Sequence, residues 1–244
     1  MTDSKASGSG PTDRKVPSRW GPRWSRWVGR FMARVMWRTE VRHVDRLPRT
    51  GPVLVVANHI GIADGPLLHG VIPRGSHFLI GGHMMEGTFG RFLKAAQQIT
   101  VEGSGREALA QGLAVLKRGD VVGVFPEGTR GGGEAESVHG GAAWLALRSG
   151  APLVPVAVLG TRLPGESVHA WPELRRRMLM DFGEATPLDI PDNLKGRARQ
   201  SWAEERVAAI LRDHLTAVQT TTDLELPRDD PRAAERAAND AQEA

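Results

Sequence analysis

Apolar runs of strand length alternate with helically spaced segments along the middle of this chain. The runs are rich in Val, Ile, Leu and Phe and lie at residues 53–57, 77–80, 98–101, 121–125, 153–158 and 178–182. Apolar residues recur at helical spacing over residues 65–71, 88–96, 105–118, 138–148 and 202–218. The alternation predicts an α/β fold over residues 45–222, with a mainly parallel sheet flanked by helices.

The N-terminal segment 18–38 carries a different pattern. Its apolar side chains repeat at helical spacing, at Trp20, Trp24, Trp27, Val28, Phe31 and Val35. Arginines repeat beside them, at Arg19, Arg23, Arg26, Arg30 and Arg34. This spacing predicts an amphipathic helix within the region 18–44, with an aromatic stripe beside a basic stripe. No apolar run reaches the ~18 residues that a membrane-spanning helix needs.

The charge of the chain is concentrated at its ends. The formal net charge is +4, whereas residues 1–50 alone hold twelve Lys and Arg against four Asp and Glu. Residues 223–244 hold three Arg against seven Asp and Glu, which leaves residues 51–222 neutral. Residues 1–17 and 223–244 have few apolar side chains to bury, so we expect both to be disordered tails.

Three interpretations of the N-terminal helix follow from its pattern. It can lie in a membrane interface, with indole rings at headgroup depth and guanidinium groups on lipid phosphates. It can instead pack on the α/β domain, or bind nucleic acid through its basic stripe. The tryptophans favour an anionic membrane surface over nucleic acid, and packing is compatible with membrane contact. We therefore expect a peripheral protein at the cytoplasmic face of the cell membrane, with no nucleic-acid partner, and leave its oligomeric state open.

A first polar cluster follows the strand at 53–57. It contains Asn58, His59 and Asp64, at the strand end where ligands gather in open α/β sheets. A tight turn can bring the Asp64 carboxylate onto an imidazole nitrogen of His59. Such a pair makes a general base, because the carboxylate fixes the imidazole tautomer and stabilises the imidazolium. The alternative is that Asn58 and Asp64 are loop and cap residues and that His59 is structural.

A second polar cluster follows the strand at 121–125, in the run Phe-Pro-Glu-Gly-Thr-Arg of residues 125–130. Arg130 can bind a phosphate through a bidentate fork, and Gly128 lets the backbone approach a ligand closely. Glu127 can accept a hydrogen bond from a substrate hydroxyl or hold Arg130 in place. The alternative is a Pro/Gly turn with a surface ion pair.

Composition excludes several kinds of chemistry. The chain has no cysteine, so disulfides, a thiolate nucleophile and a cysteine-based metal site are impossible. The histidines other than His59 show no convincing ligand spacing. We therefore expect no metal and no other cofactor.

Together, the Asn-His-x4-Asp motif of residues 58–64 and the Phe-Pro-Glu-Gly-Thr-Arg motif resemble the glycerolipid acyltransferase family of the lysophosphatidate type. Their order and separation match that family, and residues 153–158 resemble its late Val-Pro-Val strand. The resemblance covers roughly residues 45–190 and implies a glycerol-phosphate-acyltransferase-like fold. It also implies an enzyme of phospholipid biosynthesis that makes phosphatidate from lysophosphatidate and an acyl thioester.

The resemblance implies roles for single residues. His59, supported by Asp64, would deprotonate the acceptor hydroxyl, which attacks the thioester of acyl-CoA or acyl-carrier protein without an acyl-enzyme. Asn58 would help to place the loop or the donor. The acceptor would be bound by residues of the second motif, namely Phe125, Glu127, Gly128, Thr129 and Arg130.

Three positions depart from the family pattern. Gly61 stands where members often have a serine, and His139 stands where a lysine is frequent. The strand at 98–101 leads into Glu-Gly rather than Asp-Arg, so Arg106 is the candidate replacement for a phosphate-binding arginine. Its alternative is an ordinary surface arginine. The departures leave open an acyltransferase with another lipid acceptor, such as an amino-lipid or a mannolipid, or an inactive lipid- or acyl-carrier-binding module.

Overall fold

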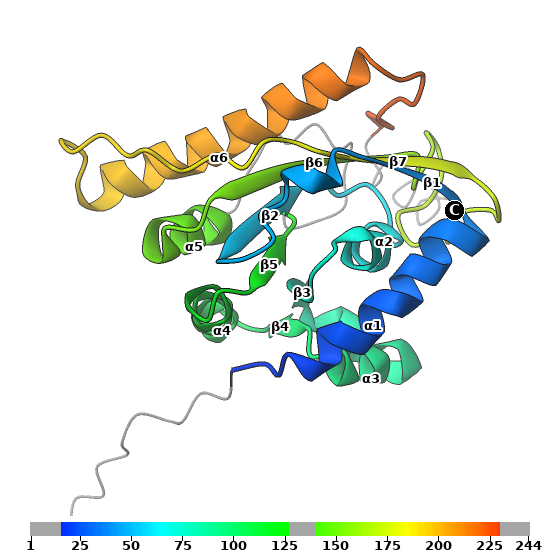
Figure 1. Ribbon diagram of the computed structural model, residues 1–244, viewed down its shortest axis with the longest axis horizontal. Coiled ribbons are helices and arrows are strands. Elements are labelled where there is room, and N and C mark those ends of the chain that lie inside the picture. Colours follow the sequence, from blue (N-terminus) through cyan, green and yellow to red (C-terminus); the bar gives the residue numbers. More distant parts are fainter. Residues whose placement is uncertain (1–15, 127–139, 230–244) are drawn as a thin grey trace, which may run out of the picture.

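The computed structural model describes residues 16–126 and 140–229 (Figure 1). Within these residues, a seven-stranded sheet has the order β1-β7-β6-β2-β5-β3-β4. The strands are β1 (Arg38–Arg42), β2 (Val53–Ala57), β3 (Ser76–Gly81), β4 (Ile99–Val101), β5 (Val121–Val124), β6 (Leu153–Leu159) and β7 (Arg177–Phe182). Neighbouring strands are parallel except β6 and β7. The prediction of a mainly parallel sheet is confirmed.

Helices cover both faces of this sheet (Figure 1). They are α1 (Trp20–Phe31), α2 (Asp64–Val71), α3 (Gly87–Ala95), α4 (Arg106–Lys117), α5 (Gly141–Ser149) and α6 (Gly196–Gln219). Shorter turns are the π-helical η1 (Met32–Met36) and the 3-10 segments η2 (Val44–Arg46) and η3 (Gly82–Met85). Helix α2 lies on one face of the sheet, and α4, α5 and α6 pack on the other.

The central strand β2 explains why the sheet is covered on both sides. Its Val53, Val55 and Ala57 join the core beneath α2, whereas Leu54 and Val56 join the core beneath α4 and α5. Successive side chains of a strand point to opposite faces, so an unbroken apolar run needs helices on both. β2 is buried throughout, so its position in the sheet is fixed. The polar residues that follow Ala57 therefore have a fixed place at the carboxyl end of this strand.

Helix α1 packs on α2 through its small residues, and Trp24 of the aromatic stripe packs edge-on against Phe92 of α3. A Cβ placed on Gly29 would lie 2.2 Å from the carbonyl oxygen of Pro66 in α2, so only glycine permits this approach. Three other members of the stripe face outward, with Trp20 70% exposed, Trp27 56% and Phe31 55%. One face of the helix therefore packs on the domain, as one interpretation predicted, and most of the aromatic stripe stays uncovered.

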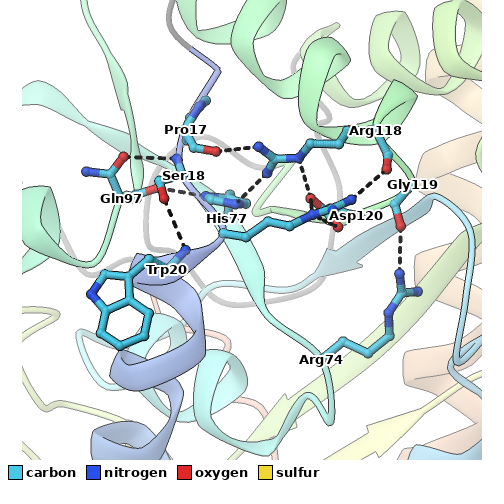
Figure 2. A network of polar contacts seen from close by, with 10 residues as sticks. Pro17, Ser18, Trp20, Arg74, His77, Gln97, Arg118, Gly119 and Asp120 are labelled. Carbon is cyan, nitrogen blue, oxygen red and sulfur yellow. Dashed lines mark hydrogen bonds and ion pairs between the residues drawn. The ribbon is translucent and has the colours of Figure 1, made fainter.

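A polar network fixes the start of α1 (Figure 2). The Arg19 guanidinium donates to the Asp120 carboxylate at 2.9 Å, and Arg118 donates to the Pro17 carbonyl oxygen at 2.7 Å. Burial by itself raises the pKa of the Asp120 carboxyl, but hydrogen bonds and charges from Arg19 and Arg118 outweigh it and lower the pKa. The network ties the chain before α1 to the loop between α4 and β5 (Figure 2).

Two predicted domain boundaries are wrong. Strand β1 belongs to the sheet through its parallel pairing with β7, so the α/β domain begins before residue 45. Residues 223–229 contain no helix or strand, but they pack on the domain, and one of them, Leu226, is buried. Residues 1–15 and 230–244 of the predicted tails lie outside the described residues. Within the described part, no helix is long and apolar enough to cross a membrane.

Candidate active site

His59 and Asp64 meet in the turn between β2 and α2. The His59 Nδ1–H donates to Asp64 Oδ2 at 2.8 Å, since an ionised carboxylate can only accept. The same oxygen accepts the backbone N–H groups of Ile60 at 2.7 Å and Gly61 at 2.9 Å. The carboxylate is fully buried, and the turn folds back onto it. The tight turn that we predicted therefore brings the two side chains together.

A residue that the sequence did not single out holds the other carboxylate oxygen. The Thr161 hydroxyl, directly after β6 and Gly160, donates to Asp64 Oδ1. Thr161 is buried and 97 positions away from Asp64 in the chain. It supplies a hydroxyl beside the pair, where Gly61 has replaced the family's frequent serine. Gly160 and Thr161, directly after the late Val-Pro-Val strand, are the sequence signal that could have pointed to a role for Thr161.

The His59 ring is oriented from two sides. Asp64 fixes the tautomer that carries the proton on Nδ1, which leaves Nε2 able to accept a proton. Phe125 stacks on the imidazole with 4.1 Å between ring centroids and an interplanar angle of 18°. The side chain of His59 keeps 15% of its surface exposed. The arrangement has the parts of a general base: a fixed tautomer, a buried carboxylate and an accessible nitrogen.

Asn58 joins the end of β2 to β6. Its side chain is fully buried, its Nδ2 donates to the Val158 carbonyl oxygen at 2.9 Å, and its Oδ1 accepts the Val158 N–H at 2.7 Å. Asn58 therefore holds the turn in place, which is one of the two roles expected for it. Its full burial does not support the other role, a contact with the donor.

A cavity of about 830 Å³ adjoins His59. Its wall is mainly apolar and comes from several elements, with Val28, Met32, Phe78, Phe89, Phe92 and Phe125 among the lining residues. Pockets of this size and character suit ligands with a large apolar part. An apolar ligand bound in this cavity would lie next to the His59 imidazole.

One buried histidine in the cavity wall differs from His59. The ring nitrogens of His69 lie 2.8 Å from Ser25 Oγ and 2.9 Å from Ser76 Oγ. Burial, with smaller effects from His77 and Arg26, lowers the pKa of His69 to about 4. His69 is therefore neutral near pH 7 and links α1, α2 and β3 through hydroxyl groups.

The described residues include only the start of the second motif. Phe125 lines the cavity, whereas Glu127, Gly128, Thr129 and Arg130 lie outside the described residues, as does His139. Arg106 begins α4 and is exposed, and among the described residues Gly105 and Ala108 line the cavity beside it but Arg106 does not. Its position does not support the predicted contact with substrate. Within the described residues, no cluster of His, Asp or Glu is arranged to hold a metal ion.

The family is shown by comparison with known sequences. The sequence model of the family described as Acyltransferase matches residues 38–159, which is half of the chain. The chain belongs to the acyltransferase family. The resemblance that the two motifs indicated is confirmed, and so is the expectation that the protein is an acyltransferase.

Individual relatives cover the chain in part. The 1-acyl-sn-glycerol-3-phosphate acyltransferase of Bacillus subtilis is 30% identical over 125 residues, which are 50% of this chain and 62% of that protein. An uncharacterized protein of Mycobacterium tuberculosis is 30% identical over 146 residues, which are 54% of this chain and 40% of that protein. The chain thus matches less than two thirds of the length of these curated relatives.

A solved structure supports the fold. The crystal structure of the 1-acyl-sn-glycerophosphate acyltransferase from Thermotoga maritima superposes with a TM-score of 0.58 at 20% identity. The match covers 80% of this chain and 78% of that one. The predicted glycerol-phosphate-acyltransferase-like fold is therefore confirmed.

Proposed function

We propose that this protein transfers a fatty acyl group from acyl-CoA or acyl-carrier protein to the free hydroxyl of lysophosphatidate, giving phosphatidate. The observation that carries the proposal is the His59–Asp64 pair in the wall of a large apolar cavity. The name of the Bacillus subtilis relative supports the same acceptor.

The proposed chemistry uses His59 as a general base. Its Nε2 takes the proton of the acceptor hydroxyl while that oxygen attacks the thioester carbonyl carbon. The carbon–sulfur bond then breaks, and the thiolate leaves with the proton that His59 received. Asp64 stabilises the imidazolium between these steps, because its carboxylate already accepts the Nδ1 proton. Cleavage of the thioester drives the reaction, so the protein contributes chiefly proximity and proton transfer.

The cavity suits the acyl chain of such a donor. Its aromatic and aliphatic wall runs from His59 to residues of α1 and α3. An acyl chain that lies along this wall leaves water, and its carbonyl end can stop beside the imidazole. No cofactor other than the acyl carrier enters this chemistry.

The exposed face of α1 supports a peripheral place on an anionic membrane. Trp27 is exposed, and the guanidinium groups of Arg26 and Arg30 lie 4.8 Å and 5.4 Å from its ring centroid. Val28 of the same helix and Met32, the first residue of η1, line the cavity, so a lipid surface on α1 would adjoin the proposed acyl site. An anionic leaflet attracts each nearby arginine by about 1 kcal/mol, and the cytoplasmic face carries such lipids.

A second apolar segment supports the same orientation. Trp171 stacks on Trp37 with 6.1 Å between ring centroids and keeps about half of its surface exposed. Leu174, three residues later, is also exposed, while Val168 and His169 of this loop line the cavity. Exposed tryptophans thus lie close to cavity-lining residues on both sides: Trp27 precedes Val28 in α1, and Trp171 packs edge-on against Phe89.

A second candidate is acyl transfer to another lipid acceptor. It is favoured by the position of Arg106, which is exposed and does not line the cavity. A binding module without catalysis is less favoured. The buried Asp64 carboxylate accepts four hydrogen bonds, one of them from His59, and so holds this imidazole in the arrangement of a general base.

An acceptor screen tests the proposal. Purified protein, one acyl-CoA and a panel of lysolipids are assayed for thiol release, with reactions lacking acceptor as the blank. We expect release with lysophosphatidate. Release with a different lysolipid alone would select the second candidate, and no release with any acyl-CoA or acyl-carrier-protein donor would contradict an acyltransferase function.

A further inference from the structure

A buried arginine lies behind the His59–Asp64 turn. Arg162 follows Thr161 directly and is 1% exposed. Its Nε–H donates to the carbonyl oxygen of Ile60 at 2.8 Å, and Ile60 is the residue after His59. Two consecutive residues therefore hold the turn from two sides: Thr161 binds the carboxylate of Asp64, and Arg162 binds the backbone next to His59.

The C-terminal segment neutralises this arginine. The two terminal nitrogens of Arg162 donate to the two oxygens of Asp229 at 2.9 Å and 2.7 Å, which is a bidentate pair. The Gly165 N–H adds a further bond to Asp229 at 2.9 Å. A buried guanidinium needs such a partner, because an unpaired charge inside a protein is strongly unfavourable. Hydrogen bonding and charge from Arg162 lower the pKa of the Asp229 carboxyl, so the pair is ionised at neutral pH.

Apolar packing holds the same segment in place. Leu226 is buried in one cluster with Ile60, Leu159 and Leu215. The C-terminal segment therefore reaches the catalytic turn in two ways: Leu226 shares the apolar cluster of Ile60, and Asp229 pairs with Arg162, which binds the Ile60 carbonyl oxygen. Arg162, Leu226 and Asp229 all lie beyond residue 159, where the match to the family sequence model ends.

We infer that Arg162 and Asp229 are positioning residues for His59 and Asp64, and that Leu226 and Asp229 complete the active site from outside. The Arg162 guanidinium donates to the Ile60 carbonyl oxygen and, at 3.1 Å, to the Glu166 carbonyl oxygen, and Asp229 orients it further through the bidentate contact. Loss of the Asp229 carboxylate removes the bidentate contact and loosens the hold of Arg162 on the backbone beside His59. The expected loss of rate rests on the proposed function. The expected change in the geometry of the turn does not depend on it.

The test changes the accessible end of the pair. In Asp229→Asn, the new amide N–H group faces the N–H groups of Arg162, so the bidentate contact is lost. The Asp229 side chain is 30% exposed, so the change is made at the accessible partner. We expect kcat to fall about tenfold with KM for both substrates unchanged, since a small misplacement of a catalytic group costs rate more than binding. Asp229→Glu keeps a carboxylate for the fork and should restore most of the rate.

Asp223→Asn is the matched control. Asp223 belongs to the same segment and pairs with Arg177 at 2.6 Å on the surface, without a contact to the catalytic turn. We expect this variant to keep the parent's kcat. Thermal unfolding of all variants separates loss of rate from loss of folded protein.

A second readout does not depend on activity. Amide hydrogen exchange at Ile60 and Gly61 reports the bonds of the turn to Asp64, and we expect it to be faster in Asp229→Asn than in Asp223→Asn. If the protein failed the acceptor screen, this comparison would still decide the positioning role. Equal exchange and equal kcat in the two variants would overturn the inference. A lower KM for the acceptor in Asp229→Asn, with kcat unchanged, would also overturn it and make Arg162 an anion-binding residue.

Discussion

Two His–Asp pairs of similar length lie among the described residues, and one of the two has the surroundings of a base. His59 lies 2.8 Å from Asp64, and His43 lies 3.0 Å from Asp181 of β7. Asp64 is buried and His59 lines the apolar cavity, whereas the His43 side chain is 49% exposed and is not part of that cavity's wall. The hydrogen bond alone therefore does not distinguish a catalytic pair from a structural one.

The two carboxylates also differ in what they hold. Asp64 collects a hydroxyl and two backbone N–H groups besides His59, all from the turn or from the end of β6. Asp181 lies between two histidines, because His214 Nε2 is 3.8 Å from its Oδ1 and 2.9 Å from its carbonyl oxygen. The first arrangement orients one imidazole toward a cavity, and the second connects β7 to α6 and to the loop after β1.

The largest expected effect comes from removing the charge of each carboxylate. Asp64→Asn should lower kcat by about 10³–10⁴-fold, the size known for this change in a Ser-His-Asp triad, since an amide stabilises the wrong tautomer. Asp181→Asn should leave kcat unchanged. Initial rates of acyl transfer, measured with both substrates saturating, check the difference, and similar losses in the two variants would erase the distinction drawn between the pairs.

The next largest effect concerns the Thr161 hydroxyl, which donates to Asp64 and not to Asp181. Thr161→Val should lower kcat about tenfold and the free energy of unfolding by about 2 kcal/mol, because a buried carboxylate loses a hydrogen bond. Thr161→Ser keeps the hydroxyl and should restore both values. Kinetics and urea unfolding measure the two effects, and a valine variant with parental rate would show that Thr161 has no part in positioning.

A smaller effect, on binding, tests the surface next to the cavity. Replacing Arg23, Arg30 and Arg34 of α1 and η1 by alanine should weaken binding to anionic vesicles by about 3 kcal/mol, at about 1 kcal/mol per arginine. The matched control replaces three exposed arginines of α6, Arg199, Arg206 and Arg212, and changes the net charge equally. Vesicle co-sedimentation reads the result, and equal loss in both triple variants would mean that charge alone, not the α1 surface, attracts the membrane.

The smallest effect uses a third histidine that has no carboxylate partner. Burial lowers the pKa of His69 from 6.5 to about 4, so between these values the unfolded chain binds a proton that the folded protein does not. Stability from this group is therefore present above pH 6.5 and falls as the pH drops, by up to about 1.4 kcal/mol per pH unit. His69→Gln should flatten this part of the urea-unfolding profile, and the exposed His83→Gln should not. An unchanged slope in His69→Gln would contradict the neutral buried state.

Local patterns in the sequence were enough to predict most of the sheet and the contact between His59 and Asp64. The run at 53–57 is apolar at every position, and such a run fits only a strand covered on both faces. His59 and Asp64 lie within one turn of each other, so their contact depends on local geometry. Gly150, at the end of α5, has a positive φ of 66° that favours glycine.

Features that depend on distant segments could not be predicted in this way. Strand β1 reads Arg-Thr-Glu-Val-Arg and has little apolar pattern, because it is an edge strand that exists through its pairing with β7. The contact of Thr161 with Asp64 and that of Asp229 with Arg162 join residues 97 and 67 positions apart. The packing of α1 on α2 through Gly29 was equally hidden, although the favoured membrane interpretation already turned the aromatic stripe outward.

The most direct test of the central claim exchanges the two histidines for alanine in parallel. Radiolabelled acyl-CoA and lysophosphatidate are incubated with the parent, His59→Ala and His43→Ala, each checked for folding by circular dichroism. The His59→Ala protein should lose at least about a hundredfold in rate, the lower range for a general base, while His43→Ala keeps the parental rate. Parental acyl transfer by folded His59→Ala would contradict the assignment of the base.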